Sequence, residues 1–165
     1  MIVQELLMKI EFDVNMTVGK MYDYMLRHVM TSFQGILGEA VGILLMVGFF
    51  LTYKWVYLVA GIVIVLYLPV TLYLKSRHQV MNNEVFKQPL HYVMDDEGIT
   101  VSVDGNSDSQ KWKDMYRAVS TTRSVILYTN HVNACIFPKD DLGSKKDDVI
   151  EMISTHMEPK RVNIR

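Results

Sequence analysis

The chain has little cysteine and no excess of charge of either sign. Cys135 is the one cysteine among 165 residues, so an intrachain disulfide is excluded. The formal net charge of −1 at pH 7 lacks the strongly basic balance of a dedicated nucleic-acid binder, and we expect no nucleic-acid partner. The first apolar cluster is short and is broken by Gln4, Glu5, Lys9 and Glu11, with no A-x-A-like cleavage site. This pattern argues against a signal peptide.

Charge is nearly absent from residues 35–74. Of 17 basic and 18 acidic residues in the chain, only Lys54 and Glu39 lie there. Residues 36–53 and 55–74 form two apolar runs, and a helix of 20 residues covers about 30 Å, the thickness of the bilayer hydrocarbon. A domain this small cannot bury both runs. We therefore expect two membrane spans, at about 36–53 and 55–74, joined as an antiparallel hairpin.

Positive charge lies on the outer flanks of this hairpin. The turn carries Lys54 alone, which by the positive-inside rule places both termini in the cytoplasm of a multi-pass membrane protein. The flanking basic residues are Lys20, Arg27, Lys75, Arg77 and Lys87, with His28 and His78 nearby.

Three features inside the apolar runs each have two interpretations. Gly38 and Gly42 have the small-xxx-small spacing that allows close helix packing, either within the hairpin or between copies in a homo-oligomer. Glu39 is an intramembrane acid, which is either hydrated near the cytoplasmic edge or part of a proton or ion path. Pro69 predicts a kink in the second span.

The segment before the hairpin predicts a strand and a helix. Apolar and polar residues alternate over residues 6–16, as in a half-buried strand that must pair with strands from the C-terminal region. Thr17 can cap a helix to about Thr31. Its apolar face would lie on the inner leaflet or pack on the soluble domain. That face consists of Met21, Tyr24, Met25, His28 and Val29.

After the hairpin the pattern changes to short strands. A polar stalk over residues 75–87 ends at Pro89, and strands are expected at 90–94, 99–103, 110–113, 116–120, 124–129 and 134–137. Turns are expected at 95–98, with a positive φ at Gly98, at 105–108 and around 130–131. A final helix, with Ser144 and Asp147 as a capping box, presents an apolar stripe. The stripe is Val149, Ile150, Ile153 and Met157, and a basic tail at 160–165 follows.

These elements predict an α+β membrane protein with a small antiparallel sheet or barrel and a C-terminal capping helix. Three parts are expected. Residues 1–34 form a cytoplasmic strand and amphipathic helix, residues 35–74 form the transmembrane hairpin, and residues 75–165 form a cytoplasmic domain.

The order of these parts and three local stretches resemble the YcxB-like family of bacterial membrane proteins. HYVMDDEGITV resembles its strand, acidic-Gly turn and strand, and SQKWKDMYRAV resembles its tryptophan-bearing strand. ACIFPKDDL resembles its apolar strand running into Pro-Lys and a terminal helix, although Asp140 and Asp141 are more acidic than expected. The resemblance implies a C-terminal domain similar to bacterial pleckstrin-homology-like domains, and a bacterial cytoplasmic membrane. The family has no established activity to carry over.

The sequence contains no catalytic constellation. The five histidines have no metal-ligand spacing, and no Walker-type loop is present, so we expect no enzyme, metal or cofactor. Cys135 lies in an apolar strand and is interpreted as a buried small hydrophobe rather than a nucleophile. Asp95, Asp96 and Glu97 form a solvated turn or hold a cation.

A few residues are candidates for binding. Trp112 is either a core anchor or part of a ligand surface. Lys139 either contacts a phosphate or lipid head group or is solvated. Lys75, Arg77 and Lys87 either contact anionic lipid together with the basic tail or are the positive flank that any cytoplasmic end of a span shows. The leading hypothesis is a non-enzymatic membrane protein whose domain binds a protein segment or a lipid head group. The alternative is a subunit of a small transport or stress-response assembly.

Overall fold

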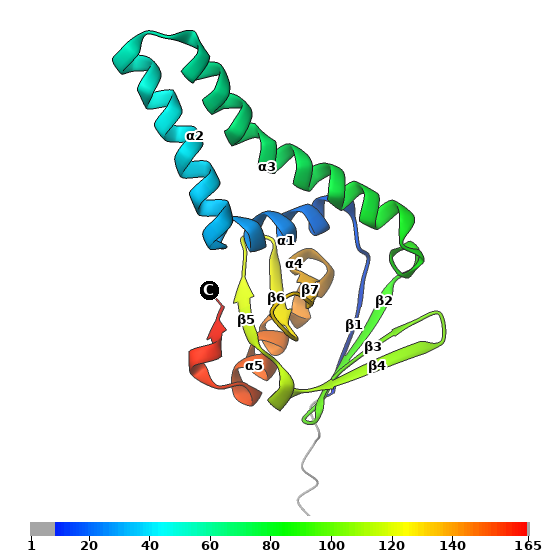
Figure 1. Ribbon diagram of the computed structural model, residues 1–165. Helices are drawn as coiled ribbons and strands as arrows, with labels where there is room; N and C mark the ends of the chain where they lie inside the picture. Colours follow the sequence, from blue (N-terminus) through cyan, green and yellow to red (C-terminus); the bar gives the residue numbers. More distant parts are fainter. Residues whose placement is uncertain (1–8, 165) are drawn as a thin grey trace, which may run out of the picture.

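Two four-stranded sheets and a long helical hairpin make up the computed structural model, which describes residues 9–164 (Figure 1). The chain is therefore α+β, as predicted. In chain order the elements are β1 (Ile10–Val14), α1 (Val18–Met30), α2 (Phe33–Thr52), α3 (Trp55–Asn82), η1 (Glu84–Lys87), β2 (Leu90–Met94), β3 (Gly98–Val103), β4 (Asn106–Lys111), η2 (Trp112–Asp114), β5 (Arg117–Ser120), β6 (Ser124–Tyr128), β7 (Ala134–Pro138), α4 (Lys139–Leu142), η3 (Gly143–Lys145), α5 (Lys146–His156), η4 (Pro159–Arg161) and β8 (Val162–Asn163).

Strand β1 is separated from its partner in the sequence by the whole helical region. Its side chains alternate between buried and exposed, with Ile10, Phe12 and Val14 buried. It pairs antiparallel with β2, with Val14 opposite Leu90. This confirms the expected pairing with a C-terminal strand, although residues 6–8 of the predicted strand lie outside the described residues.

Sheet A has the order β1-β2-β3-β4 and sheet B the order β7-β6-β5-β8. All neighbours are antiparallel except β5 and β8, which run parallel with Ala118 opposite Val162. We refer to the two sheets with α4 and α5 as the sheet domain. Its core contains a cluster of aromatic rings from both sheets: the ring centroid of Phe137 lies 5.4 Å from that of Phe12 and 5.0 Å from that of Tyr92. Val149 and Ile153 of α5 are fully buried against this core. Both belong to the apolar stripe that the sequence predicts for the final helix.

Helices α2 and α3 form the antiparallel hairpin that the apolar runs predict (Figure 1). Gly42 and Gly61 face each other: a Cβ on Gly42 would lie 3.2 Å from the carbonyl oxygen of Gly61. The small residues therefore permit close packing within the hairpin. Helix α3 continues past Leu74 to Asn82, so most of the polar stalk is a direct extension of the second apolar helix.

Both hairpin helices are long and apolar enough to cross a membrane. Only 11% of the apolar window of each helix is buried within the chain. The core helix of a soluble protein is mostly buried, and these two helices are mostly exposed.

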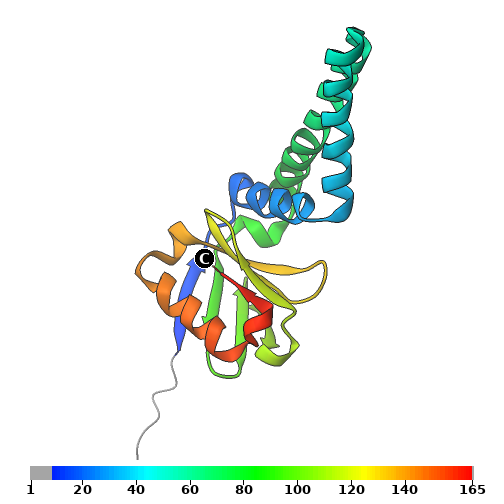
Figure 2. The same cartoon turned by 90° about the vertical axis from the view of Figure 1, so that its left-hand side faces the viewer.

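Helix α1 connects the hairpin to the sheet domain (Figure 2). Its first turn is capped by Thr17, whose hydroxyl accepts a hydrogen bond from the backbone N–H of Lys20 at 3.4 Å, as predicted. Tyr24 and His28 pack on the sheet domain: the Tyr24 hydroxyl donates to the carbonyl of Val132 at 3.0 Å, and His28 Nδ1 lies 3.2 Å from the Tyr128 hydroxyl. We expected the apolar face of α1 to lie on the inner leaflet or to pack on the soluble domain. In the structure Tyr24 and His28 of this face pack on the sheet domain.

The turn at residues 95–98 forms, but the expected positive φ at Gly98 is wrong. The Asp95 carboxylate accepts hydrogen bonds from the backbone N–H groups of Glu97 and Gly98, at 2.9 and 3.1 Å. The positive-φ glycines of the described residues are Gly105 and Gly143. Position 98 has no room for a side chain, because a Cβ there would overlap the backbone carbonyl of Gln110 on β4.

Four other local predictions differ from the structure. The turn expected at 105–108 consists of Asp104 and Gly105, and the strand expected at 110–113 is β4, which begins at Asn106 and ends before Trp112. Ser144 caps no helix, because the chain enters α5 through the helical turn η3 and Lys145 already has helical angles. The expected basic tail contains η4 and the short strand β8, and Arg165 lies outside the described residues.

Candidate functional site

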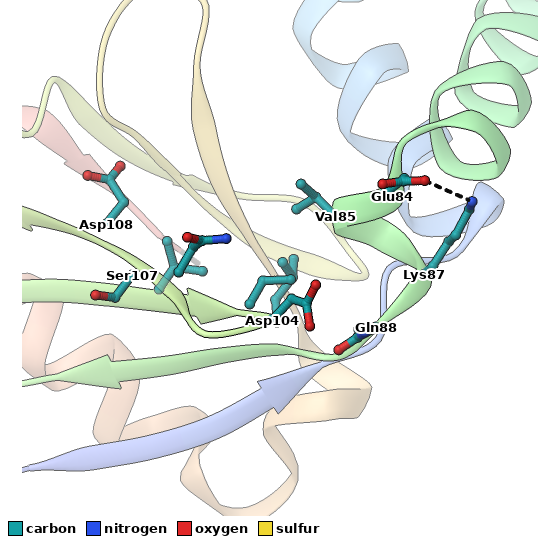
Figure 3. A pocket seen from close by; sticks show the side chains of 11 residues that line it. Glu84, Val85, Lys87, Gln88, Asp104, Ser107 and Asp108 are labelled. Carbon is teal, nitrogen blue, oxygen red and sulfur yellow. Dashed lines mark ion pairs between the residues drawn. The ribbon is translucent and has the colours of Figure 1, made fainter.

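A hollow of about 540 Å³ lies between η1 and the β3–β4 hairpin (Figure 3). Val85 points from η1 toward the hairpin (Figure 3). We call it the hairpin groove. Its apolar residues are Val85, Leu90, Val101 and Val103, and its polar residues are Glu84, Lys87, Gln88, Asp104, Asn106, Ser107 and Asp108.

The hairpin groove is acidic. Glu84, Asp104 and Asp108 contribute carboxylates, and Lys87 is the one cationic residue among the lining residues. The Lys87 ammonium lies 3.8 Å from the Glu84 carboxylate. Asp104 and Asp108 form no ion pair within the described part of the chain. Such a surface favours a ligand that is positively charged and partly apolar.

The tight turn of the hairpin determines which backbone groups of β4 face outward. Asp104 and Gly105 both have positive φ, at 49° and 79°, as a two-residue turn of type I′ requires. The pair that closes such a turn, Val103 and Asn106, is hydrogen-bonded, and bonded pairs then alternate along the ladder. The N–H and C=O groups of Ser107, Ser109 and Lys111 therefore point away from β3, toward the outer edge.

The outer edge of β4 is open, whereas that of β1 is covered. Five of the six residues of β4 are exposed, and no described strand pairs with its outer side. At the end of β1 the Asp141 carboxylate of α4 accepts from the backbone N–H of Asn15 at 3.0 Å, and Lys145 donates to the carbonyl of Glu11 at 2.5 Å. The unpaired edge of sheet A is thus the one beside the hairpin groove, where another chain can add a strand.

The sheet domain also carries the match to known proteins. The model of the YcxB-like protein family matches residues 95–154, from the turn before β3 into α5. This part of the chain is similar to the YcxB-like family. The predicted resemblance is confirmed over these residues. No curated protein and no solved structure matches the chain.

Within the YcxB-like segment, Trp112 is a core residue. Its side chain is 5% exposed, and its indole N–H donates to the carbonyl of Asp95 at 2.7 Å. The ring stacks on His156 of α5, with centroids 5.3 Å apart, and His156 lies 3.4 Å from the Asp96 carboxylate. These contacts join the turn before β3 to the C-terminal helix and leave little of the ring for a ligand.

Lys139, also in the YcxB-like segment, is half-buried rather than solvated. Its ammonium donates to the backbone carbonyl of Thr121 at 2.7 Å, and its backbone N–H donates to that of Arg123 at 2.8 Å. Lys139 therefore fixes the start of α4 to the β5–β6 turn. Asp141, two residues further on, is one of the two acids that the family pattern did not lead us to expect. Its carboxylate lies 2.6 Å from the ammonium of Lys20.

The other predicted site residues lie outside the YcxB-like segment. Lys75 and Arg77 are exposed on the part of α3 that extends toward the sheet domain. Glu39 lies in α2, half-buried, and its Oε1 is buried with no hydrogen-bond partner. The structure therefore does not gather Trp112, Lys139, Lys75, Arg77 and Glu39 into one site.

Cys135, in β7, is half-buried. Burial raises the pKa of its thiol to about 11, which disfavours the nucleophilic thiolate. The candidate functional residues that sequence reasoning missed are Ser107 and Ser109 on the β4 edge. Their signal was the Asp-Gly pair at 104–105, a strong marker of a two-residue hairpin turn.

Proposed function

We propose that this chain is a multi-pass protein of the bacterial cytoplasmic membrane that presents a pleckstrin-homology-like binding module to the cytoplasm. The module binds an extended protein segment, which adds to sheet A along β4. The observation that carries the proposal is the open β4 edge beside an acidic, apolar groove.

The membrane part of the proposal is supported by the exposed apolar surfaces of α2 and α3. The basic residues near the sheet domain outnumber Lys54 in the hairpin turn, which favours a cytoplasmic sheet domain. Trp55 and Tyr53 at the turn are exposed aromatic side chains of the type that occupies the opposite interface.

The pleckstrin-homology-like assignment is supported by the strand order. One sheet of four strands is followed by a second sheet, antiparallel except for β8, and a C-terminal helix, α5, which packs on the core. The short strand β8 after α5 and the helical insertion between β1 and β2 are additions to this plan. Neither addition changes the order of the other strands.

The charge and shape of the hairpin groove define the bound segment. A strand added to β4 receives main-chain hydrogen bonds from Ser107, Ser109 and Lys111 and directs alternate side chains over the groove. Asp104 and Asp108 select lysine or arginine, and Val101 and Val103 select apolar side chains. The expected partner is an extended segment in which basic and apolar residues lie on one face.

A proline substitution tests this mode of binding. Because the N–H of Ser109 points outward, Ser109→Pro removes an edge donor without breaking the β3–β4 ladder. Peptides selected from an extended-peptide library against the full chain in nanodiscs should bind wild type and Ser109→Ala and lose binding to Ser109→Pro. Amide exchange over residues 106–111 should slow when the peptide binds. Peptides that bind Ser109→Pro equally well would contradict strand addition.

The alternative is a subunit of a small membrane transport or envelope-stress assembly, and Glu39 favours it. An acid within an apolar helix whose buried Oε1 has no hydrogen-bond partner in the chain is costly, and a partner helix would remove that cost. Two helices offer too little wall for a transport path, so this function requires oligomerisation.

Glu39→Gln separates the two functions. As a binding module, the variant keeps the peptide affinity and the oligomeric state of wild type. As a transport subunit, it loses assembly in native mass spectrometry and proton flux in liposomes, and Glu39→Asp restores part of both. Equal flux in Glu39→Gln and wild type would rule out the transport role of this acid.

A further inference from the structure

A second hollow, also of about 540 Å³, lies against sheet B rather than sheet A. It is formed by residues 113–117, from η2 to the start of β5, by the β6–β7 loop and by η4, so three segments of the sequence contribute to it. We call it the basic hollow. Its cationic or titratable bases are Lys113, Arg117, His131, Lys160 and Arg161, and Asp114 is the one acid among its lining residues.

Most of this positive charge has no counter-charge in the protein. Among residues 9–164, no carboxylate forms an ion pair with Lys113, Arg117 or Lys160. Arg161 is the exception: its guanidinium lies 3.5 Å from Glu158 and donates to the carbonyl of Met115 at 3.3 Å. Three cations thus remain available to an external anion.

Arg117 is held in place without being neutralised. Its guanidinium carbon lies 4.5 Å from the ring centroid of Tyr128 and 5.8 Å from that of Tyr116, the geometry of a cation–π contact. The Nε atom is buried and has no hydrogen-bond partner. A buried donor without an acceptor is costly, which marks Arg117 as a side chain positioned for more than packing.

We propose that the basic hollow binds a phosphate group. The planar guanidinium of Arg117 matches two phosphate oxygens, and the exposed ammonium groups of Lys113 and Lys160 supply further charge-assisted hydrogen bonds. His131 packs on Tyr116 at a tilt, with centroids 4.2 Å apart, and forms an aromatic wall for the organic part of the ligand. The hollow and the hairpin groove are lined by different residues, so one molecule has room for both ligands.

The position of the β6–β7 loop favours a membrane lipid as the source of this phosphate. The loop contributes His131 to the hollow, and the next residue, Val132, accepts a hydrogen bond from Tyr24 of α1 at 3.0 Å. Helix α1 leads directly into the apolar helix α2. Val132 is itself an exposed apolar side chain at this edge. A small soluble phosphate compound offers the same chemistry, and the test distinguishes the two sources.

The test uses the full chain and a charge-reversed variant, Lys113→Glu with Lys160→Glu. The control, Arg123→Glu with Lys146→Glu, makes the same change in net charge at residues outside the hollow. Calorimetry with glycerol 3-phosphate probes a soluble source. Native mass spectrometry of protein released from phosphatidylcholine nanodiscs that contain phosphatidylglycerol probes the lipid source. Circular dichroism checks folding, and Lys113→Gln with Lys160→Gln replaces the charge-reversed variant if that variant misfolds.

We expect the hollow variant to lose about tenfold or more in affinity for one probe, while the control keeps wild-type binding. Loss of phosphatidylglycerol adducts alone assigns the site to a lipid head group, and loss of glycerol 3-phosphate binding assigns it to a soluble phosphate. The proposal is overturned if neither probe binds wild type, or if hollow and control variants lose binding equally. Peptide binding to β4 is measured in parallel and should not change in either variant.

Discussion

At the scale of single residues, close packing rather than backbone conformation explains Gly98. Its φ is not positive, yet a Cβ would overlap the backbone of Gln110 on the neighbouring strand. Because backbone atoms of a paired strand cannot move aside cheaply, Gly98→Ala should lower stability by about 1–3 kcal/mol. Gly19→Ala is the control, since no atom lies within 4 Å of its Cβ position in α1. Near-UV circular dichroism melts in detergent would show equal midpoints if this explanation is wrong.

A second residue-scale prediction concerns the reactivity of Cys135. Burial raises its pKa to about 11, so the thiol stays protonated below that pH. At pH 8 only about one molecule in a thousand carries the thiolate, and iodoacetamide should react slowly with the folded chain. The rate should rise about tenfold per pH unit up to pH about 11. A Cys135→Ser chain with Thr122→Cys provides an exposed thiol for comparison. Equal rates for both thiols at pH 8 would contradict burial of Cys135.

At the scale of elements, an ion pair joins α1 to α4. Lys20 Nζ lies 2.6 and 2.7 Å from the two carboxylate oxygens of Asp141, and the side chains are only 20% and 15% exposed. Asp141→Asn should cost about 1–3 kcal/mol, because it weakens a shielded pair that also binds the N–H of Asn15. A double-mutant cycle with Lys20→Met should give a coupling of at least about 1 kcal/mol. The exposed pair Lys87–Glu84, at 3.8 Å, should give less than about 0.5 kcal/mol.

Elements with a strong local pattern were predictable from the sequence, and elements defined by distant contacts were not. The alternation of β1 and the Thr17 cap of α1 depend on neighbouring residues, and both predictions are confirmed. Strand β4 is exposed on both faces, so it shows no alternation, and its edge was missed as a site. The position of Trp112 depends on the carbonyl of Asp95 and the ring of His156, which only the folded chain brings together.

At the scale of the whole molecule, the helices α1, α2 and α3 are an insertion between two neighbouring strands. The sequence predicted this arrangement in outline, because an alternating strand before the apolar runs needs a partner after them. The chain therefore passes between the sheet domain and the hairpin twice, once through α1 and once through α3 (Figures 1 and 2). This double connection restricts the orientation of both the hairpin groove and the basic hollow relative to the hairpin.

The insertion also predicts how the sheet domain can be isolated. Strand β1 contributes the buried side chains of Ile10, Phe12 and Val14, each worth about 1.5–3 kcal/mol of burial. Their sum is comparable to the whole stability of a small domain, about 5–15 kcal/mol. Residues 88–165 alone should therefore show no cooperative unfolding.

Joining β1 to β2 directly should restore the fold. Val14 lies opposite Leu90 in the ladder, so an Asn-Gly turn can connect residues 9–14 to residues 90–165 as a two-residue hairpin. This chain should unfold cooperatively in urea, with lower stability than the full protein because it lacks the contacts of Met21 and Tyr24. Phe12→Ala in the joined chain is the control and should lose about 3 kcal/mol or more. If residues 88–165 unfold cooperatively without β1, the first strand belongs to the anchor rather than to the sheet domain, and the hairpin is an N-terminal attachment instead of an insertion.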